Sequence, residues 1–251
     1  MLTSVIIPCY NAESTVRRAI QSVLVQEGCE VELLVIDDAS TDGTRQVLLD
    51  MQAEDSGIKT VLLTESRGAG NARNAGIELA RGEMLAFLDA DDTWSGGKLA
   101  RQVNYMITNE VDFSCTYYSR NDERASEKKV VKSPAVAGYS LALKCNPIGT
   151  STVVVRSRLL GKMRFSEMAR RQDYLLWLQI LEKGNDVHCL PFVGTEYLCG
   201  TGNSLSSNRL KSLKYNWRVL RSFEIGIIPA VYYIVNQAFK SRKKNLGQRW
   251  W

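Results

Sequence analysis

Histidine is nearly absent from this sequence of 251 residues, and no long apolar segment is present. The single histidine, His188, excludes sites that need several histidines, such as a zinc-binding HExxH helix. A divalent metal would have to be held mainly by carboxylates, which favours Mn²⁺ or Mg²⁺. No apolar stretch approaches the roughly 18 residues of a membrane-spanning helix. The longest, over residues 225–235, contains Pro229.

Closely spaced cysteine pairs are also missing. The six cysteines include no CxxC pair, which argues against zinc-ribbon and thioredoxin-like sites. The first four residues lack the basic segment of a signal peptide and lead directly into an apolar run. These features predict a protein of the reducing cytosol.

Charge is distributed unevenly along the chain. Residues 209–251 hold ten of the 32 lysines and arginines but one acidic residue, Glu224. The remaining residues carry a slight negative charge, so a mildly acidic body is followed by a basic tail. The length and composition are those of one globular domain with such an extension.

Short apolar runs alternate with segments of helical spacing through the first 95 residues. These runs lack the alternation of apolar and polar residues that marks a strand with one solvated face, so both faces are expected to be buried. The sequence therefore predicts an α/β fold with a mostly parallel central sheet flanked by helices. Expected strands are 4–8, 32–36, 59–64, 83–88, 112–118, 151–155, 187–190 and 193–198. Expected helices are 12–26, 44–54, 71–81, 98–109, 172–182 and a helical region from 212 onward.

The sharpest feature is an acidic cluster directly after a predicted strand. Asp89, Asp91 and Asp92 lie within four residues, and carboxylates that close repel one another unless a cation neutralises them. Ligands of open α/β sheets bind at the carboxyl ends of strands. A divalent ion there would hold a substrate diphosphate. The alternative is a solvated acidic turn that caps the next helix.

A second acidic pair, Asp37-Asp38, ends another apolar strand. Its carboxylates could accept hydrogen bonds from a ribose or a base, and the alternative is capping of the helix that begins near Thr44. Because both acidic groups end neighbouring parallel strands, we expect them at one rim of the sheet.

The segment 67–74 partly matches the dinucleotide fingerprint G-x-G-x-x-G. Arg73 stands where the third glycine belongs, and the segment follows the third strand instead of the first, so the match is weak. A helix N-terminus with Arg67 and Arg73 nearby is suited to holding an anionic group. A simple entry from loop to helix remains the alternative.

Together these segments resemble the family 2 glycosyltransferases of the GT-A fold. The residues that carry the resemblance are 5–11, 35–44, 67–76 and 87–92, in matching order and spacing. Weaker similarity continues through 172–178 and 202–208. The similarity is to bacterial enzymes that assemble surface polysaccharides such as O-antigen, capsule or teichuronic acid. It implies a glycosyltransferase domain over 1–208, with a nucleotide-sugar half (1–95) and an acceptor half (96–208).

The resemblance also implies which residues hold the donor nucleotide. Pro8, Tyr10 and Asn11 would line the nucleotide pocket. Asp38 would reach the base. The donor would be a nucleotide-sugar, with UDP as the expected nucleotide.

The reacting end of the site is implied in the same way. Asp89, with Ala90 beside it, would contact the ribose side of the donor, and Asp91 would ligate Mn²⁺ or Mg²⁺ at the diphosphate. Asp173, before an aromatic-rich helix, would be the general base of an inverting transfer. Helix capping is the alternative for Asp173. Trp177 lies one turn further on, where it could form an acceptor wall or pack in the core.

One departure from the family concerns the diphosphate. Many relatives have Tyr-Arg where this chain has Tyr197-Leu198. Arg209, or Arg170 and Arg171, could replace the missing arginine. A non-catalytic nucleotide-sugar-binding subunit is the main alternative function. A nucleotidyltransferase or NAD-dependent enzyme would show a glycine-rich loop after the first strand, which this chain lacks.

The tail combines apolar and aromatic residues with flanking lysine and arginine. The basic run 240–244, followed by Trp250 and Trp251, suits an interfacial helix on an anionic membrane leaflet. That would place the protein on the inner face of the cytoplasmic membrane, close to a lipid-linked saccharide acceptor. The alternative is a helix packed on the domain. No nucleic-acid motif is present, so we expect no nucleic-acid partner.

Overall fold

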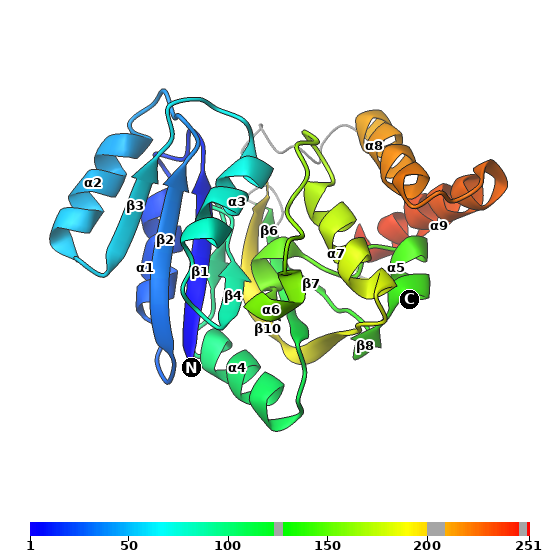
Figure 1. The fold of residues 1–251 in the computed structure, drawn as a ribbon, viewed down its shortest axis with the longest axis horizontal. Coiled ribbons are helices and arrows are strands. Elements are labelled where there is room, and N and C mark those ends of the chain that lie inside the picture. The colour runs from blue at the N-terminus through cyan, green and yellow to red at the C-terminus, as the bar shows by residue number, and fades with distance from the viewer. Residues whose placement is uncertain (123–127, 200–208, 246–249) are drawn as a thin grey trace.

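The computed structural model describes residues 1–122, 128–199, 209–245 and 250–251 as an α/β fold with helices on both faces of a central sheet (Figure 1). The strands are β1 (Leu2–Cys9), β2 (Glu30–Asp37), β3 (Ile58–Leu62), β4 (Met84–Phe87), β5 (Thr93–Trp94), β6 (Phe113–Asp122), β7 (Lys129–Val131), β8 (Val136–Ala137), β9 (Val154–Arg156) and β10 (Val187–Cys199). The helices are α1 (Val16–Leu24), α2 (Thr44–Glu54), α3 (Ala69–Leu79), α4 (Lys98–Thr108), α5 (Tyr139–Lys144), α6 (Ser157–Leu160), α7 (Gln172–Glu182), α8 (Arg209–Ser222) and α9 (Ile227–Asn245).

The sheet has the strand order β3-β2-β1-β4-β9-β6-β10-β5, and its first four members are parallel. This confirms the mixed α/β prediction. Strand β9 runs antiparallel to both β4 and β6, and β5 runs antiparallel to β10. The donor half and the acceptor half that the sequence predicts therefore share one sheet.

Three predicted strands differ from the structure. The segment 151–155 begins in a 3-10 turn, η1 (Thr150–Thr152), and β9 starts at Val154. The two short strands at 187–190 and 193–198 are one strand, β10, with register shifts against β6 between Leu190 and Thr195. Those irregularities explain why the apolar pattern was interrupted there.

The sheet separates two hydrophobic clusters, one on each face. Ile6 and Phe87 point into the cluster covered by α3, α5, α7, α8 and α9, whereas Val5 and Ile7 point into the one covered by α1, α2 and α4. Both side-chain directions of the central strands are thus buried, which is why their sequences read as continuous apolar runs. The same arrangement leaves the loops at the strand ends as the polar surface of the domain.

The tail packs on the domain beside α5 and α7. The amide of Gln237 in α9 donates to the carbonyl of Leu143 at 2.8 Å and to the hydroxyl of Tyr174 at 2.9 Å. Asn216 in α8 donates to Gln237 at 2.7 Å. Within the described part of the chain, none of the helices combines the length and apolar character that a membrane crossing requires.

Candidate active site

The loops that follow β1, β2 and β4 meet at one edge of the sheet. Strand β1 lies between β2 and β4, and the register pairs Cys9 with Asp37 and Ile6 with Phe87. Parallel strands end at the same edge, so the residues that follow them gather there. The structure therefore places both predicted acidic groups on one rim, as the sequence indicates.

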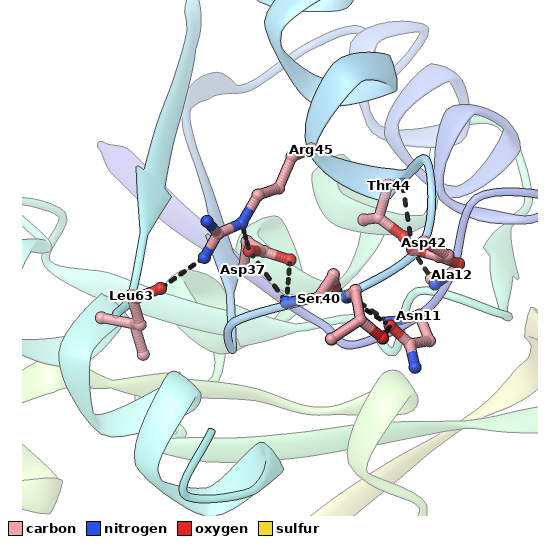
Figure 2. Close-up of polar contacts among 9 residues, drawn as sticks. Asn11, Ala12, Asp37, Ser40, Asp42, Thr44, Arg45 and Leu63 are labelled. Atoms are coloured by element: carbon pink, nitrogen blue, oxygen red, sulfur yellow. Dashed lines mark hydrogen bonds and ion pairs between the residues drawn. The ribbon is translucent and has the colours of Figure 1, made fainter. Parts of the chain in front are cut away.

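The loop after β1 is fastened to the loop after β2, as Figure 2 shows. Asn11 has a positive φ of 48°, and its side-chain oxygen accepts a hydrogen bond from the backbone N–H of Thr41 at 2.8 Å. Asp37 is buried and accepts from the Nε of Arg45 at 2.7 Å. Tyr10 is 53% exposed, whereas Pro8 is buried. Asn11 thus holds the loops together, and Tyr10 offers an open ring beside them.

Asp38 bonds to the loop between β3 and α3. Its carboxylate is 1% exposed and accepts hydrogen bonds from the Ser66 hydroxyl at 2.8 Å, the Arg67 N–H at 3.0 Å and the Gly68 N–H at 2.7 Å. Gly68 has a φ of 90°, a conformation that favours glycine, and caps α3. Asp38 therefore shapes the rim by fixing the loop between β3 and α3.

The two arginines predicted at the start of α3 have different surroundings. Arg67 is exposed and pairs with Glu65 at 2.9 Å. Arg73 is buried, donates a short hydrogen bond to Asp89, and lies 5.2 Å from the centre of the Phe165 ring. The pair is therefore not brought together at one anion site, and Arg73 faces the acidic cluster instead.

The three carboxylates after β4 occupy distinct environments. Asp89 binds Arg73, and its N–H donates to the Ser151 hydroxyl at 3.1 Å. Asp92 is 2% exposed and accepts from that same hydroxyl at 2.6 Å. Asp91 reaches the surface, yet desolvation of its carboxylate and the charge on Asp89 raise its pKa to about 6. Burial and the two neighbouring carboxylates also raise the pKa of Asp92.

The predicted base lies beside this cluster. Asp173, in the first turn of α7, accepts a hydrogen bond from the Thr150 hydroxyl at 3.0 Å and from the Tyr174 N–H at 2.8 Å. Burial alone would lower the pKa of Arg73, but the charges on Asp89 and Asp173 raise it. One buried guanidinium thus interacts with the acidic loop after β4 and with the start of α7.

Two residues that contact the predicted site, Thr150 and Ser151, do not stand out in the sequence. They lie in η1 and contact Asp173, Asp89 and Asp92. The available signal is a run of three small polar residues, 150–152, and the apolar segment that follows it places the last two of them in the predicted strand 151–155. Their partners are distant in the sequence, so spacing alone could not reveal the contacts.

Trp177 does not form an acceptor wall. Its side chain is 1% exposed and packs against Phe87, Phe113 and Phe165, with ring centres 5.3 to 6.0 Å apart. The helical spacing placed it one turn from Asp173, but α7 turns this side chain toward the sheet. The alternative of core packing is therefore the correct one.

A divalent metal would have few protein ligands here. In the residues that the structure covers, no three acidic, cysteine or histidine side chains are grouped as a cage. Asp92 is bound to Ser151, and one oxygen of Asp89 is bound to Arg73. Asp91 remains as a hard oxygen ligand in a crowded acidic environment, which suits a Mg²⁺ or Mn²⁺ ion completed by substrate phosphates and water.

Comparison with known proteins identifies relatives over nearly the whole chain. The family model described as glycosyl transferase family 2 matches residues 4–162. TuaG of Bacillus subtilis (strain 168), named for teichuronic acid biosynthesis, is 36% identical over 247 residues, which are 98% of each chain. WfgD of Escherichia coli is 37% identical over 246 residues, 97% of this chain and 95% of the relative. Its name describes a UDP-Glc:α-D-GlcNAc-diphosphoundecaprenol β-1,3-glucosyltransferase.

A solved structure confirms the fold. Staphylococcus aureus TarS, residues 1–349 in complex with UDP-GlcNAc, superposes with a TM-score of 0.74 at 22% identity. The match covers 98% of this chain and 70% of that one. At this identity the likeness establishes the architecture alone, and it bears out the GT-A prediction.

Proposed function

Because this chain belongs to glycosyl transferase family 2, we propose that it transfers a sugar from UDP to a lipid-linked saccharide during assembly of a bacterial surface polysaccharide. Two relatives above 35% identity support the biological setting, since one is named for teichuronic acid and the other for a diphosphoundecaprenol acceptor. The name of the second relative also supports UDP as the donor nucleotide.

One observation carries the chemical proposal. Arg73 donates a hydrogen bond to Asp89, in the acidic loop after β4, and Asp173, in the first turn of α7, lies near enough for its charge to raise the pKa of Arg73. In an inverting transfer the acceptor attacks one side of the donor sugar while the diphosphate leaves from the other. The base and the groups that bind the diphosphate must therefore lie about one sugar ring apart. The gathering of these side chains around one guanidinium meets that need.

In the proposed reaction, Asp173 removes the proton from the attacking hydroxyl of the acceptor. The acceptor oxygen forms a bond to the anomeric carbon while the bond from that carbon to the diphosphate oxygen breaks. The proton moves to the Asp173 carboxylate, and UDP leaves from the opposite side of the sugar, so the configuration inverts. Tyr10 and the loop fixed by Asp38 would hold the nucleotide. Asp89, beside Ala90, would face the ribose.

The leaving diphosphate carries negative charge that must be neutralised. Asp91 would hold Mn²⁺ or Mg²⁺, which supplies Lewis-acid stabilisation of that charge when bound. Arg170 is a better candidate than Arg209 for the missing basic group, since its Nη1 is buried without a partner among the described residues. The side chain of Arg209 lies outside them.

We also propose that the chain works at the inner face of the cytoplasmic membrane. The exposed face of α9, which we call the α9 stripe, is apolar and comprises Ile227, Ile228, Val231, Tyr232, Val235 and Phe239. Exposed Lys214 and Arg218 lie on the adjoining α8. Trp250, expected at the interface, is 4% exposed and donates to the carbonyl of Lys132, so it is not available to lipid. The apolar stripe replaces it as the surface that would enter the headgroup region.

Calorimetric titration with UDP, with and without Mn²⁺, tests the donor site. Transfer from UDP-glucose to GlcNAc-diphosphoundecaprenol then tests the reaction, with product release of UDP as the readout. We expect metal-dependent UDP binding and transfer, and we expect Asp173→Asn to bind UDP normally while losing transfer by about a hundredfold or more. If the protein binds UDP but transfers sugar from none of the UDP-sugars, a non-catalytic subunit would be favoured instead. Leu198, which stands where many relatives have an arginine, would fit that alternative.

A further inference from the structure

The turn η1 consists of polar residues that are almost completely buried. Thr150 is 6% exposed, and Ser151 and Thr152 are 0% exposed. A buried hydroxyl costs free energy unless it makes a hydrogen bond, so each of these groups should have a partner. Their partners show that two of the three residues are directed at the acidic site.

Thr150 and Ser151 contact opposite parts of that site. The Thr150 hydroxyl donates to Oδ2 of Asp173 at 3.0 Å. The Ser151 hydroxyl donates to Oδ2 of Asp92 at 2.6 Å and accepts from the N–H of Asp89 at 3.1 Å. Adjacent residues of one tight turn therefore join the proposed base to the loop after β4.

Ser151 is itself firmly anchored. Its carbonyl accepts hydrogen bonds from the indole N–H of Trp94 at 2.7 Å and from the Thr195 hydroxyl at 3.0 Å. On the other side of the turn, a Cβ at Gly149 would lie 2.5 Å from the Tyr197 hydroxyl oxygen, so the backbone is packed closely there. The turn is thus a fixed point to which the carboxylates are attached.

The Thr150 hydroxyl is not needed to close the turn. Closure is made by Thr152, whose N–H and hydroxyl both donate to the Gly149 carbonyl, at 2.9 and 2.6 Å. The Val153 N–H donates to the Thr150 carbonyl at 3.1 Å, which uses the backbone alone. The hydroxyl of Thr150 can therefore donate its hydrogen bond to Asp173 without opening the turn.

We propose that Thr150 is a positioning residue for glycosyl transfer: its hydroxyl holds Oδ2 of Asp173, so that the carboxylate meets the acceptor hydroxyl at a fixed place relative to the acidic loop. This inference rests on the proposed function. A general base works only within hydrogen-bond reach of the proton it takes, and small displacements are costly to the rate. Without the Thr150 hydroxyl, the Asp173 carboxylate would turn away from that geometry.

Three variants test this inference in the full chain, with UDP-glucose and GlcNAc-diphosphoundecaprenol as probes. Thr150→Val removes the hydroxyl and keeps the shape, and Thr150→Ser keeps the hydroxyl. Thr3→Val removes another buried hydroxyl, in β1, that makes no hydrogen bond within the described residues. We expect Thr150→Val to lower kcat about ten- to a hundredfold, as loss of a hydrogen bond to a charged group would, with the KM for donor within about twofold of wild type. Thr150→Ser and Thr3→Val should keep kcat within about threefold. Thermal melting of each variant shows that it is folded.

A double variant separates positioning from general damage. In the Asp173→Asn background, Thr150→Val should cause little further loss, because the two residues act through one carboxylate. An unchanged kcat in Thr150→Val, an equal loss in Thr3→Val, or additive losses in the double variant would each overturn the inference while wild-type transfer stands. A folded wild-type chain that binds UDP but transfers no sugar would overturn the proposed function, and this inference with it.

Discussion

At the scale of single residues, the acidic side chains after β4 differ in what surrounds them although they are neighbours in the chain. Asp89 has a basic partner in Arg73, and Asp92 has a hydroxyl donor in Ser151. Asp91 has a raised pKa, since desolvation and the charge on Asp89 oppose its ionisation. A bound cation would favour the ionised carboxylate and lower the pKa of Asp91. Of the three side chains, Asp91 should therefore be the one most affected by a bound metal.

Replacing Asp91 with asparagine should therefore weaken metal-assisted binding without unfolding the protein. We expect the Mn²⁺-dependent gain in UDP affinity to fall by about tenfold or more. The melting temperature should stay equal or rise, because a crowded negative charge is removed. Calorimetry measures the affinity, and Glu27→Gln, at an exposed position away from the site, is the control. If Asp91→Asn binds UDP with the full Mn²⁺ gain, Asp91 is not the ligand.

A buried carboxylate outside the candidate site, Glu32, is expected to contribute to stability in acid. Glu32, in β2, accepts hydrogen bonds from Ser4, Lys59 and Arg81. Burial would raise the pKa of Glu32, but these donors outweigh it and lower the pKa from 4.5 to about 2. A lowered folded-state pKa stabilises the fold above the unfolded value, and this stabilisation is lost as the pH falls from about 4.5 toward 2.

Glu32→Gln should accordingly destabilise the protein by about 2–3 kcal/mol at neutral pH. Urea unfolding at several pH values measures this difference. Its size should shrink as the pH falls below about 4.5, because the wild type loses its advantage while the variant does not titrate. A difference that stays constant with pH would show that packing, not charge, explains the loss.

At the scale of elements, hydrophobic periodicity predicts the type and approximate bounds of a helix or strand where polar or turn-forming residues flank it on both sides. It predicted α7 over residues 172–182 and the alternation of strands and helices from β1 to β4. It failed for η1 and β10, where register shifts and a turn are imposed by neighbouring strands. Such features depend on pairing between distant segments, which a local pattern does not contain.

The contact between α3 and β1 gives a prediction at this scale. A Cβ at Gly76 would lie 2.5 Å from Cγ2 of Ile6, so the helix can approach the strand only because this position has no side chain. We expect Gly76→Ala to destabilise the fold by about 1–3 kcal/mol through overpacking. Gly96→Ala is the matched control, since a Cβ there meets nothing within 4 Å. Equal unfolding midpoints for the two variants would contradict this packing argument.

At the scale of the whole molecule, the candidate site combines short-range and long-range features. The acidic pairs at strand ends were predictable because parallel topology brings strand ends together. The pairing of Arg73 with Asp89 and the contacts of Ser151 were not, since they join segments up to 62 residues apart. Likewise the sequence predicted a basic amphipathic tail, but only packing decides which face of α9 stays exposed.

The α9 stripe gives the prediction for membrane binding. Val235→Asp places a charge on the stripe, whereas Asn236→Asp places the same charge on the next residue, outside it. We expect Val235→Asp to lower affinity for phosphatidylglycerol-containing vesicles by about tenfold, because it removes apolar burial and adds repulsion. Asn236→Asp should lower it by severalfold at most. Vesicle sedimentation measures both, and equal losses would exclude the stripe as the inserted surface.

The hydrogen bonds of Gln237 connect the proposed membrane-binding helix α9 to the candidate active site. One of them joins α9 to Tyr174, the residue next to Asp173, so the helix that carries the exposed stripe is bonded directly to the helix that carries the proposed base. If the stripe rests in the headgroups, the base stands at a constant height above the lipid. The protein would then use an acceptor only when the attacking hydroxyl lies at that distance from the membrane surface. Selection of the acceptor would depend on the number of sugars already attached, as well as on their identity.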